Sequence, residues 1–224
     1  MDSGRRNRLR AGVLGANDGI ISTAGLVIGV AAANSSTTAI ATAGIASLAS
    51  GAVSMGLGEY VSVSTQRDSE LSVIRSTRER LDADPAGERL RLTRELRSRG
   101  LNDELSAAVA EDLSKKDPVG AHLVLEAGID ERNLASPWAA ARSSAFSFSL
   151  GALIPLAAIL LPGRSVRVPV AGIAVIIALA LTGWTSARLG ESPVRPAVLR
   201  LVVGGAIGMA FAFVVGQLLN VSAL

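Results

Sequence analysis

The sequence predicts an all-α membrane protein with five transmembrane helices and a cytoplasmic three-helix insert between the second and third of them. Of its 224 residues, 49% are hydrophobic and only 18% are charged, and soluble domains usually carry more charge. Five apolar runs each approach the roughly 20 residues that cross the hydrocarbon core. A charged stretch separates the second run from the third, and proline and glycine mark short helices within it.

The apolar runs are expected to be helices because a backbone in lipid must satisfy its own hydrogen bonds. They cover residues 11–33, 39–63, 138–161, 167–188 and 197–219. The first run is longer than the apolar core of a cleavable signal peptide, and no small-residue cleavage site follows it. Aromatic residues are scarce at 3%, and 23 glycines favour helices that pack closely.

Basic residues predict the orientation in a cell membrane. Four arginines precede the first run and place the N-terminus in the cytoplasm: Arg5, Arg6, Arg8 and Arg10. Residues 1–66 then hold the first two spans, 67–135 form the cytoplasmic insert, and 136–224 hold the last three. The positively charged loop between the last two spans agrees with this topology, whereas the two arginines of "PGRSVR" oppose it.

The segment between spans two and three is predicted to be a soluble helical insert. Residues 67–132 carry 12 basic and 15 acidic residues, a net charge of −3, and the rest of the chain carries +6. The second apolar run enters this segment without Gly or Pro, so its helix is expected to continue beyond the bilayer. Capping pairs mark three helix starts, and two glycines mark helix ends: Asp84-Pro85, Asp117-Pro118, Ser136-Pro137, Gly100 and Gly128.

Asp18 lies inside the first apolar run, in the stretch "GVLGANDGIISTAGLVIGVAAA". A carboxylate at the bilayer centre costs about 2.5–3.5 kcal/mol on insertion scales and normally faces a bundle interior or a water-filled path. We therefore interpret Asp18 as an ion or proton site. The alternative is that it lies near the cytoplasmic interface and caps a helix break at "GANDG".

Span two carries a second polar stripe, because Gly51, Met55 and Glu59 recur every four residues. A thioether and a carboxylate one turn apart form a mixed ligand set. The carboxylate suits manganese or ferrous ion, and the thioether favours softer transition metals. Two alternatives remain, since methionine in a helix usually packs and Glu59 can lie at the water interface.

Other features of the sequence have structural explanations that are commoner than functional ones. His122 and Glu126 have the i,i+4 spacing of a metal pair, although a solvated helix face is the commoner explanation. Small residues repeat every four positions at Gly25 and Gly29, and again from Gly204 to Gly216, which indicates close helix packing. The sequence has no cysteine and shows no nucleophile motif, phosphate loop or catalytic triad. We therefore expect neither an enzyme nor a bound cofactor, and no nucleic-acid partner.

Three blocks resemble the vacuolar iron transporter family: "NDGIISTAGLVIGVAAA", "GAVSMGLGEYVSVSTQRDSE" and "SPWAAARSSAFSFSLGALIPL". The resemblance covers nearly the whole chain in the same order. It implies five membrane helices per subunit, a homodimer, exchange of divalent metal for protons, and a path between the two subunits. The family's "DG" aspartate and "SMG" methionine match Asp18 and Met55, and Glu59 of "GEY" is a second acidic site.

The sequence departs from the family pattern in the insert and in span two. Some members have a glutamate where Ser47 stands. The resemblance also implies a ladder of glutamates that binds metal in the cytoplasm, at Thr77, Arg80, Glu88, Arg91 and Glu126. Only Glu88 and Glu126 are acidic here. The two arginines are expected to repel a divalent cation or to pair with the remaining acids.

The sequence thus predicts a dimeric transporter that moves manganese or ferrous iron out of the cytoplasm in exchange for protons. Met55 is the soft ligand, Asp18 and Glu59 supply charge and accept protons, and Glu88 and Glu126 are candidates for metal capture in the cytoplasm. Its expected partners are divalent metal ions, the lipid bilayer and a second copy of the chain. The alternative is a membrane-anchored interaction or metal-sensor protein that no longer transports.

Overall fold

The computed structural model describes residues 3–33 and 36–221, and these residues form helices with no strand among them. The all-α prediction is confirmed. The chain divides into two compact units. We call Arg6–Val61 with Pro137–Leu224 the membrane unit, and Met1–Arg5 with Ser62–Ser136 the insert unit.

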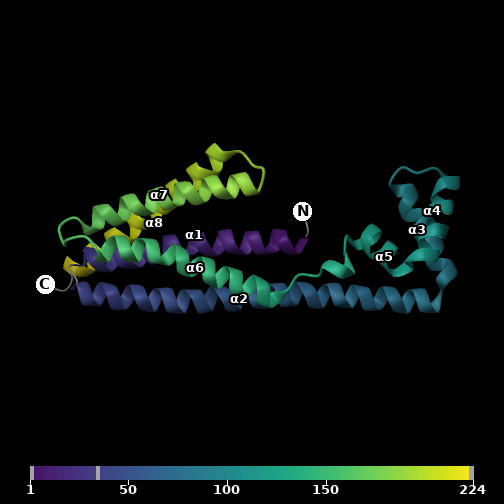
Figure 1. Cartoon of the computed structure of the whole chain (residues 1–224), viewed down its shortest axis with the longest axis horizontal. Coiled ribbons are helices and arrows are strands. Elements are labelled where there is room, and N and C mark those ends of the chain that lie inside the picture. Colours follow the sequence, from purple (N-terminus) through teal and green to yellow (C-terminus); the bar gives the residue numbers. More distant parts are fainter. Residues whose placement is uncertain (1–2, 34–35, 222–224) are drawn as a thin grey trace. The chain divides into compact units, whose positions relative to one another are not determined.

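Five helices in the described ranges are long and apolar enough to cross a membrane, as the sequence predicts. They are α1 (Ser3–Ala32), α2 (Thr37–Ala83), α6 (Pro137–Leu160), α7 (Arg167–Leu189) and α8 (Val194–Val221). Figure 1 shows α2 as one unbroken helix of 47 residues. Its length is about 70 Å at 1.5 Å per residue, whereas the hydrocarbon core is about 30 Å thick. The expected continuation of the second span as a helix is therefore confirmed.

Glycines let the helices of the membrane unit approach each other. A Cβ on Gly19 of α1 would lie 2.2 Å from the carbonyl oxygen of Phe148 on α6. A Cβ on Gly151 of α6 would lie 2.3 Å from the carbonyl oxygen of Ala16. The ring of Phe148 packs against Gly51 of α2. Helix α6 therefore packs against both α1 and α2.

The core of the membrane unit is small and aliphatic. It joins α1, α6, α7 and α8 through residues such as Val27, Ile159, Leu179 and Met209. Large apolar side chains also point outward, as Ile207 and Phe211 do on α8 with exposed fractions of 64% and 72%. Outward apolar surfaces of this kind suit contact with lipid chains.

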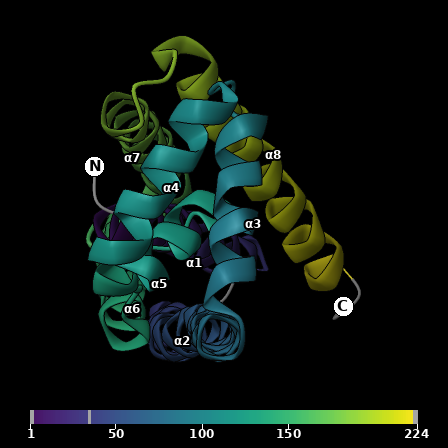
Figure 2. The ribbon, with the colours of Figure 1, turned by 90° about the vertical axis from the view of Figure 1, so that its right-hand side faces the viewer.

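The insert unit adds three α-helices to the end of α2. They are α3 (Pro85–Ser98), α4 (Asp103–Lys116) and α5 (Pro118–His122), followed by a π-helix η1 (Leu123–Ala127) and a 3-10 helix η2 (Glu131–Asn133). Both views show α3 and α4 side by side (Figures 1 and 2). Leu92 and Leu96 of α3 pack there with Ala110 of α4 and Ala121 of α5.

The predicted caps hold these short helices in place. Asp84 and Asp117 each accept a hydrogen bond at 2.9 Å from the backbone N–H three residues later. Gly100 and Gly128 adopt φ values of +98° and +66° after the helices that they end. The start of α4 was not predicted. Asn102 caps it, with its side-chain oxygen 2.8 Å from the N–H of Leu105.

Candidate functional site

Asp18 lies on an exposed stripe of α1. The stripe repeats every four residues through Leu14, Asp18, Ser22 and Leu26, and all four side chains are exposed. We call it the α1 stripe. Helix α1 is continuous through "GANDG", and Ser22 donates a hydrogen bond of 2.6 Å to the backbone carbonyl of Asp18. Asp18 therefore does not cap a helix break, and that part of the alternative is wrong.

Met55 and Glu59 lie on the packed side of α2. Met55 is half-buried and Glu59 is buried, with 9% of its surface exposed. Val53, Leu57 and Val61 on the outer side of the same helix are each about 60% exposed (62%, 60% and 60%). Within a single chain Glu59 thus faces protein, unlike Asp18.

The described residues of one chain hold no ready-made metal cage. Within these ranges, no three His, Cys, Asp or Glu side chains converge closely enough to hold a metal ion. The structure therefore does not test the roles predicted for Asp18, Met55 and Glu59, which remain predictions.

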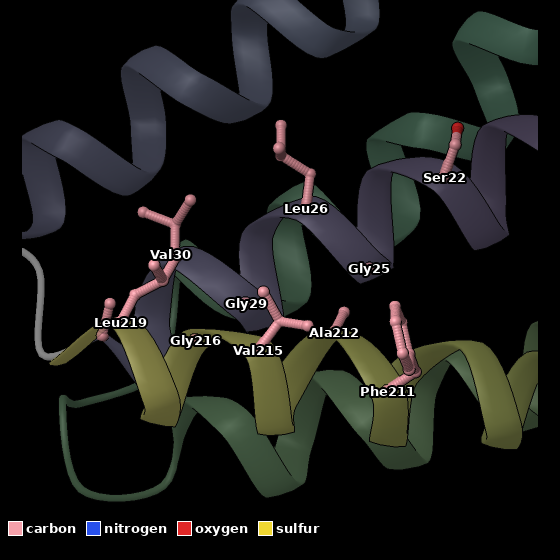
Figure 3. Close-up of a pocket in the computed structure, with 11 residues that line it drawn as sticks. Ser22, Gly25, Leu26, Gly29, Val30, Phe211, Ala212, Val215, Gly216 and Leu219 are labelled. Atoms are coloured by element: carbon pink, nitrogen blue, oxygen red, sulfur yellow. The ribbon is translucent and has the colours of Figure 1, made fainter. Parts of the chain in front are cut away.

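A groove between α1 and α8 adjoins the α1 stripe (Figure 3). It encloses about 540 Å³ and is lined mainly by apolar and small residues, with Ser22 and Leu26 of the stripe among them. The helices meet closely where a Cβ on Gly216 would lie 2.1 Å from the carbonyl oxygen of Gly29. Close packing is confirmed for these two glycines, whereas a Cβ on Gly204 would have no atom within 4 Å.

The insert unit brings five predicted residues together, and we call them the insert cluster: Arg80, Glu88, Arg91, His122 and Glu126. His122 Nδ1 lies 2.7 Å from Glu126 Oε1, and Arg91 Nη2 lies 2.7 Å from Glu126 Oε2. Arg80 Nε lies 3.4 Å from Glu88 Oε1. The expected pairing of the arginines with the remaining acids is confirmed.

The solvated-face interpretation of His122 and Glu126 is wrong. His122 is only 1% exposed, because Ala121, His122 and Leu123 all turn into the interior of the insert unit. The π-helix that begins at Leu123 keeps Glu126 beside the ring of His122. Single π-turns of this kind are rare and often occur at functional sites.

Sequence reasoning did not single out several polar side chains in the membrane unit. Asn17 Oδ1, Thr23 Oγ1 and Ser144 Oγ are buried without a hydrogen-bond partner. The rings of Tyr60 and Trp138 also pack at a centroid distance of 4.9 Å. The available signals were polar residues inside apolar runs and aromatic residues at run ends, where such rings favour the membrane interface.

Comparison with known proteins extends this description. The model of the VIT family matches residues 9–217. The chain is 36% identical over 219 residues to a vacuolar iron transporter of Acanthamoeba castellanii, covering 96% of this chain and 80% of that protein. It is 34% identical over 212 residues to vacuolar iron transporter homolog 3 of Arabidopsis thaliana, covering 94% and 82%.

Proposed function

Since this chain belongs to the VIT family, we propose that it is a metal ion transporter that moves ferrous iron or manganese across a membrane in exchange for protons. Its five apolar helices supply the membrane-spanning scaffold. The basic N-terminal segment favours a cytoplasmic N-terminus, so export from the cytoplasm is the proposed direction.

The observation that carries this proposal is the exposed carboxylate of Asp18 in an apolar helix. A charge that faces lipid is costly, so intramembrane carboxylates face a water-filled path or another protein surface. We propose that the α1 stripe faces the same stripe of a second copy. Two copies of Asp18 then lie on one aqueous path and give a divalent ion two carboxylates.

Met55 and Glu59 complete the proposed path from α2. The thioether of Met55 favours a transition metal over calcium or magnesium, which prefer oxygen ligands. Glu59 is buried against protein, so we propose it as a second site that exchanges a metal ion for a proton. Both ferrous iron and manganese accept this ligand set.

Flux into proteoliposomes tests the transport proposal. We expect Mn²⁺ uptake that depends on a pH gradient and falls at least tenfold in Asp18→Asn and in Met55→Leu. Met209→Leu is the matched control, because Met209 lies in the aliphatic core and its replacement leaves both acids in place. Wild-type flux no greater than that of empty liposomes would support a membrane-anchored protein without transport.

Cross-linking tests the paired arrangement. The chain has no cysteine, so Ser22→Cys introduces a single thiol on the α1 stripe. If two stripes face each other, mild oxidation yields a disulfide-linked dimer, which requires Cα atoms within about 7 Å. Ile173→Cys is the control, because this residue is 62% exposed but lies on α7, away from the α1 stripe. The Ile173→Cys protein is expected to stay monomeric. Equal cross-linking of both variants contradicts the proposed interface.

A further inference from the structure

The insert cluster joins four elements of the insert unit. Arg80 comes from the end of α2, Glu88 and Arg91 from α3, and His122 and Glu126 from α5 and η1. We propose that Arg80 and Arg91 act as resident cations that occupy the place of a divalent ion. The insert unit is then closed and folded without metal, and removal of the two guanidinium groups uncovers a metal site.

Each guanidinium group bridges the two carboxylates. Arg91 Nη2 lies 2.7 Å from Glu126 Oε2, and its Nη1 lies 3.8 Å from Glu88 Oε1. Arg80 Nε lies 3.4 Å from Glu88 Oε1, and its Nη2 lies 4.0 Å from Glu126 Oε2. Arg80 also donates a hydrogen bond of 3.2 Å to Thr77. Both carboxylates are thus held between the same two cations.

The burial pattern shows which groups close the cluster. The side chains of Glu88 and Glu126 are 11% and 16% exposed, whereas those of Arg80 and Arg91 are 36% and 43% exposed. The arginines therefore lie between the acids and solvent. The charges of the two carboxylates and the two guanidinium groups sum to zero. The cluster therefore has no net negative charge to attract a divalent cation, and the two guanidinium groups would repel it at contact distance.

His122 packs against both carboxylates of the cluster. Its Nδ1 lies 2.7 Å from Glu126 and 3.8 Å from Glu88, and a carboxylate can only accept a hydrogen bond. Nδ1 therefore carries a proton and donates it toward these carboxylates. Nε2 lies on the far side of the ring and is buried without a partner, in a ring that is 1% exposed. The ring thus holds the two carboxylates from inside the insert unit, on the side away from the arginines.

This inference rests on the proposed function only for the choice of Mn²⁺ as the ion. Titration calorimetry with Mn²⁺ on the full chain in detergent micelles tests it. Asp18→Asn with Glu59→Gln is used as the background, so that neither proposed acidic site of the membrane unit contributes. In this background we expect no Mn²⁺ binding at the insert. The further double change Arg80→Gln with Arg91→Gln is expected to give a Mn²⁺-binding heat that the background lacks. Adding Glu88→Gln and Glu126→Gln is expected to abolish the gain.

Arg80→Lys with Arg91→Lys is the matched control, because it keeps both charges and is expected to gain no site. The inference fails if the background protein already binds Mn²⁺ through Glu88 and Glu126, or if the double glutamine variant folds and gains nothing. Hydrogen exchange of residues 86–98 in the unmodified chain gives a measurement that does not depend on variants. Protection unchanged by EDTA supports a metal-free lock, and protection lost in EDTA overturns it.

These outcomes are separate from those of the flux assay. Uptake that depends on Asp18 can persist whichever way the insert experiment ends, because it tests the membrane unit. Loss of wild-type flux with a metal-free insert would sink the transport proposal and leave the lock intact.

Discussion

The substitution Gly19→Ala tests whether contact between α1 and α6 holds the α1 stripe in place. The added Cβ would lie 2.2 Å from the Phe148 carbonyl oxygen, 2.9 Å from its carbonyl carbon and 3.0 Å from the nitrogen of Ala152. Every one of these is a backbone atom, so no side-chain rotation relieves the overlap. The two helices must separate until the shortest contact rises from 2.2 to at least 3.0 Å.

The expected cost follows from two opposed terms. Overpacking of a well-packed interface costs about 1–3 kcal/mol, occasionally more. Replacing glycine by alanine inside a helix returns about 1 kcal/mol through helix propensity. Because the overlap is with rigid backbone, we place the overpacking term at or above the upper end, which leaves a net loss of about 2 kcal/mol. Such a loss lowers the folding equilibrium constant roughly 30-fold.

Equilibrium unfolding in mixed micelles measures this loss. The chain has two tryptophans, Trp138 on α6 and Trp184 on α7, so fluorescence reports on the membrane unit. Gly25→Ala on the same helix is the control, because its Cβ would meet only the Cβ of Ala212 at an ordinary 3.8 Å. That variant is expected to be as stable as wild type or slightly more so. If Gly19→Ala matches it, the inferred helix contact is wrong.

Three further substitutions test a helix cap, a glycine in the left-handed region and a buried aromatic ring. Asp84→Ala removes the cap of α3 and is expected to destabilise the insert unit by about 1 kcal/mol, measured by hydrogen exchange of that helix. Gly128→Ala forces a Cβ into the left-handed region at φ +66° and is expected to cost about 1–2 kcal/mol in the same measurement. Phe148→Ala removes the buried ring that packs against Gly51 of α2 and is expected to cost about 3–5 kcal/mol in micelle unfolding. Wild-type stability in any of them contradicts the contact concerned.

Most of the fold could be predicted because its signals are local. Apolar length gives the five spans, and an Asp before a Pro gives the starts of α3 and α5. The start of α4 was missed because Asn102 stands in "GLNDE" without a following proline, and its capping bond becomes visible only in three dimensions. Hydropathy does not show which face of a helix packs against a neighbouring helix. The exposure of Asp18 and the burial of Glu59 could therefore be seen only in the structure.

The site was predicted as a set of residue types, whereas the pairing of those residues is a tertiary property. Arg80, Arg91 and His122 are separated by 11 and 31 positions in the sequence, and no helical period relates them. Their contacts arise because α3 and η1 fold back toward the end of α2 within the insert unit. The i,i+4 spacing of His122 and Glu126 correctly predicted that the two side chains lie close together. The expectation that both are exposed to solvent was wrong, because the residue types alone do not show which face of the helix packs.

The acids of the insert cluster and Asp18 differ in the cations that lie near them, and this difference affects which of them can take part in transport. Glu88 and Glu126 contact guanidinium groups of their own chain, which cannot leave. Residues 11–66 contain no Lys, Arg or His at all, so this part of the chain offers Asp18 no basic neighbour. A carboxylate that must exchange a metal ion for a proton needs a partner that can dissociate, because a fixed arginine would hold it charged and occupied throughout the cycle. Introducing Ser22→Arg one turn from Asp18 supplies such a fixed cation, and we expect its Mn²⁺ flux to be at least tenfold below that of Ser22→Gln, which adds a long side chain at the same position without a charge. Equal flux in the two variants would show that Asp18 does not need to release its cation.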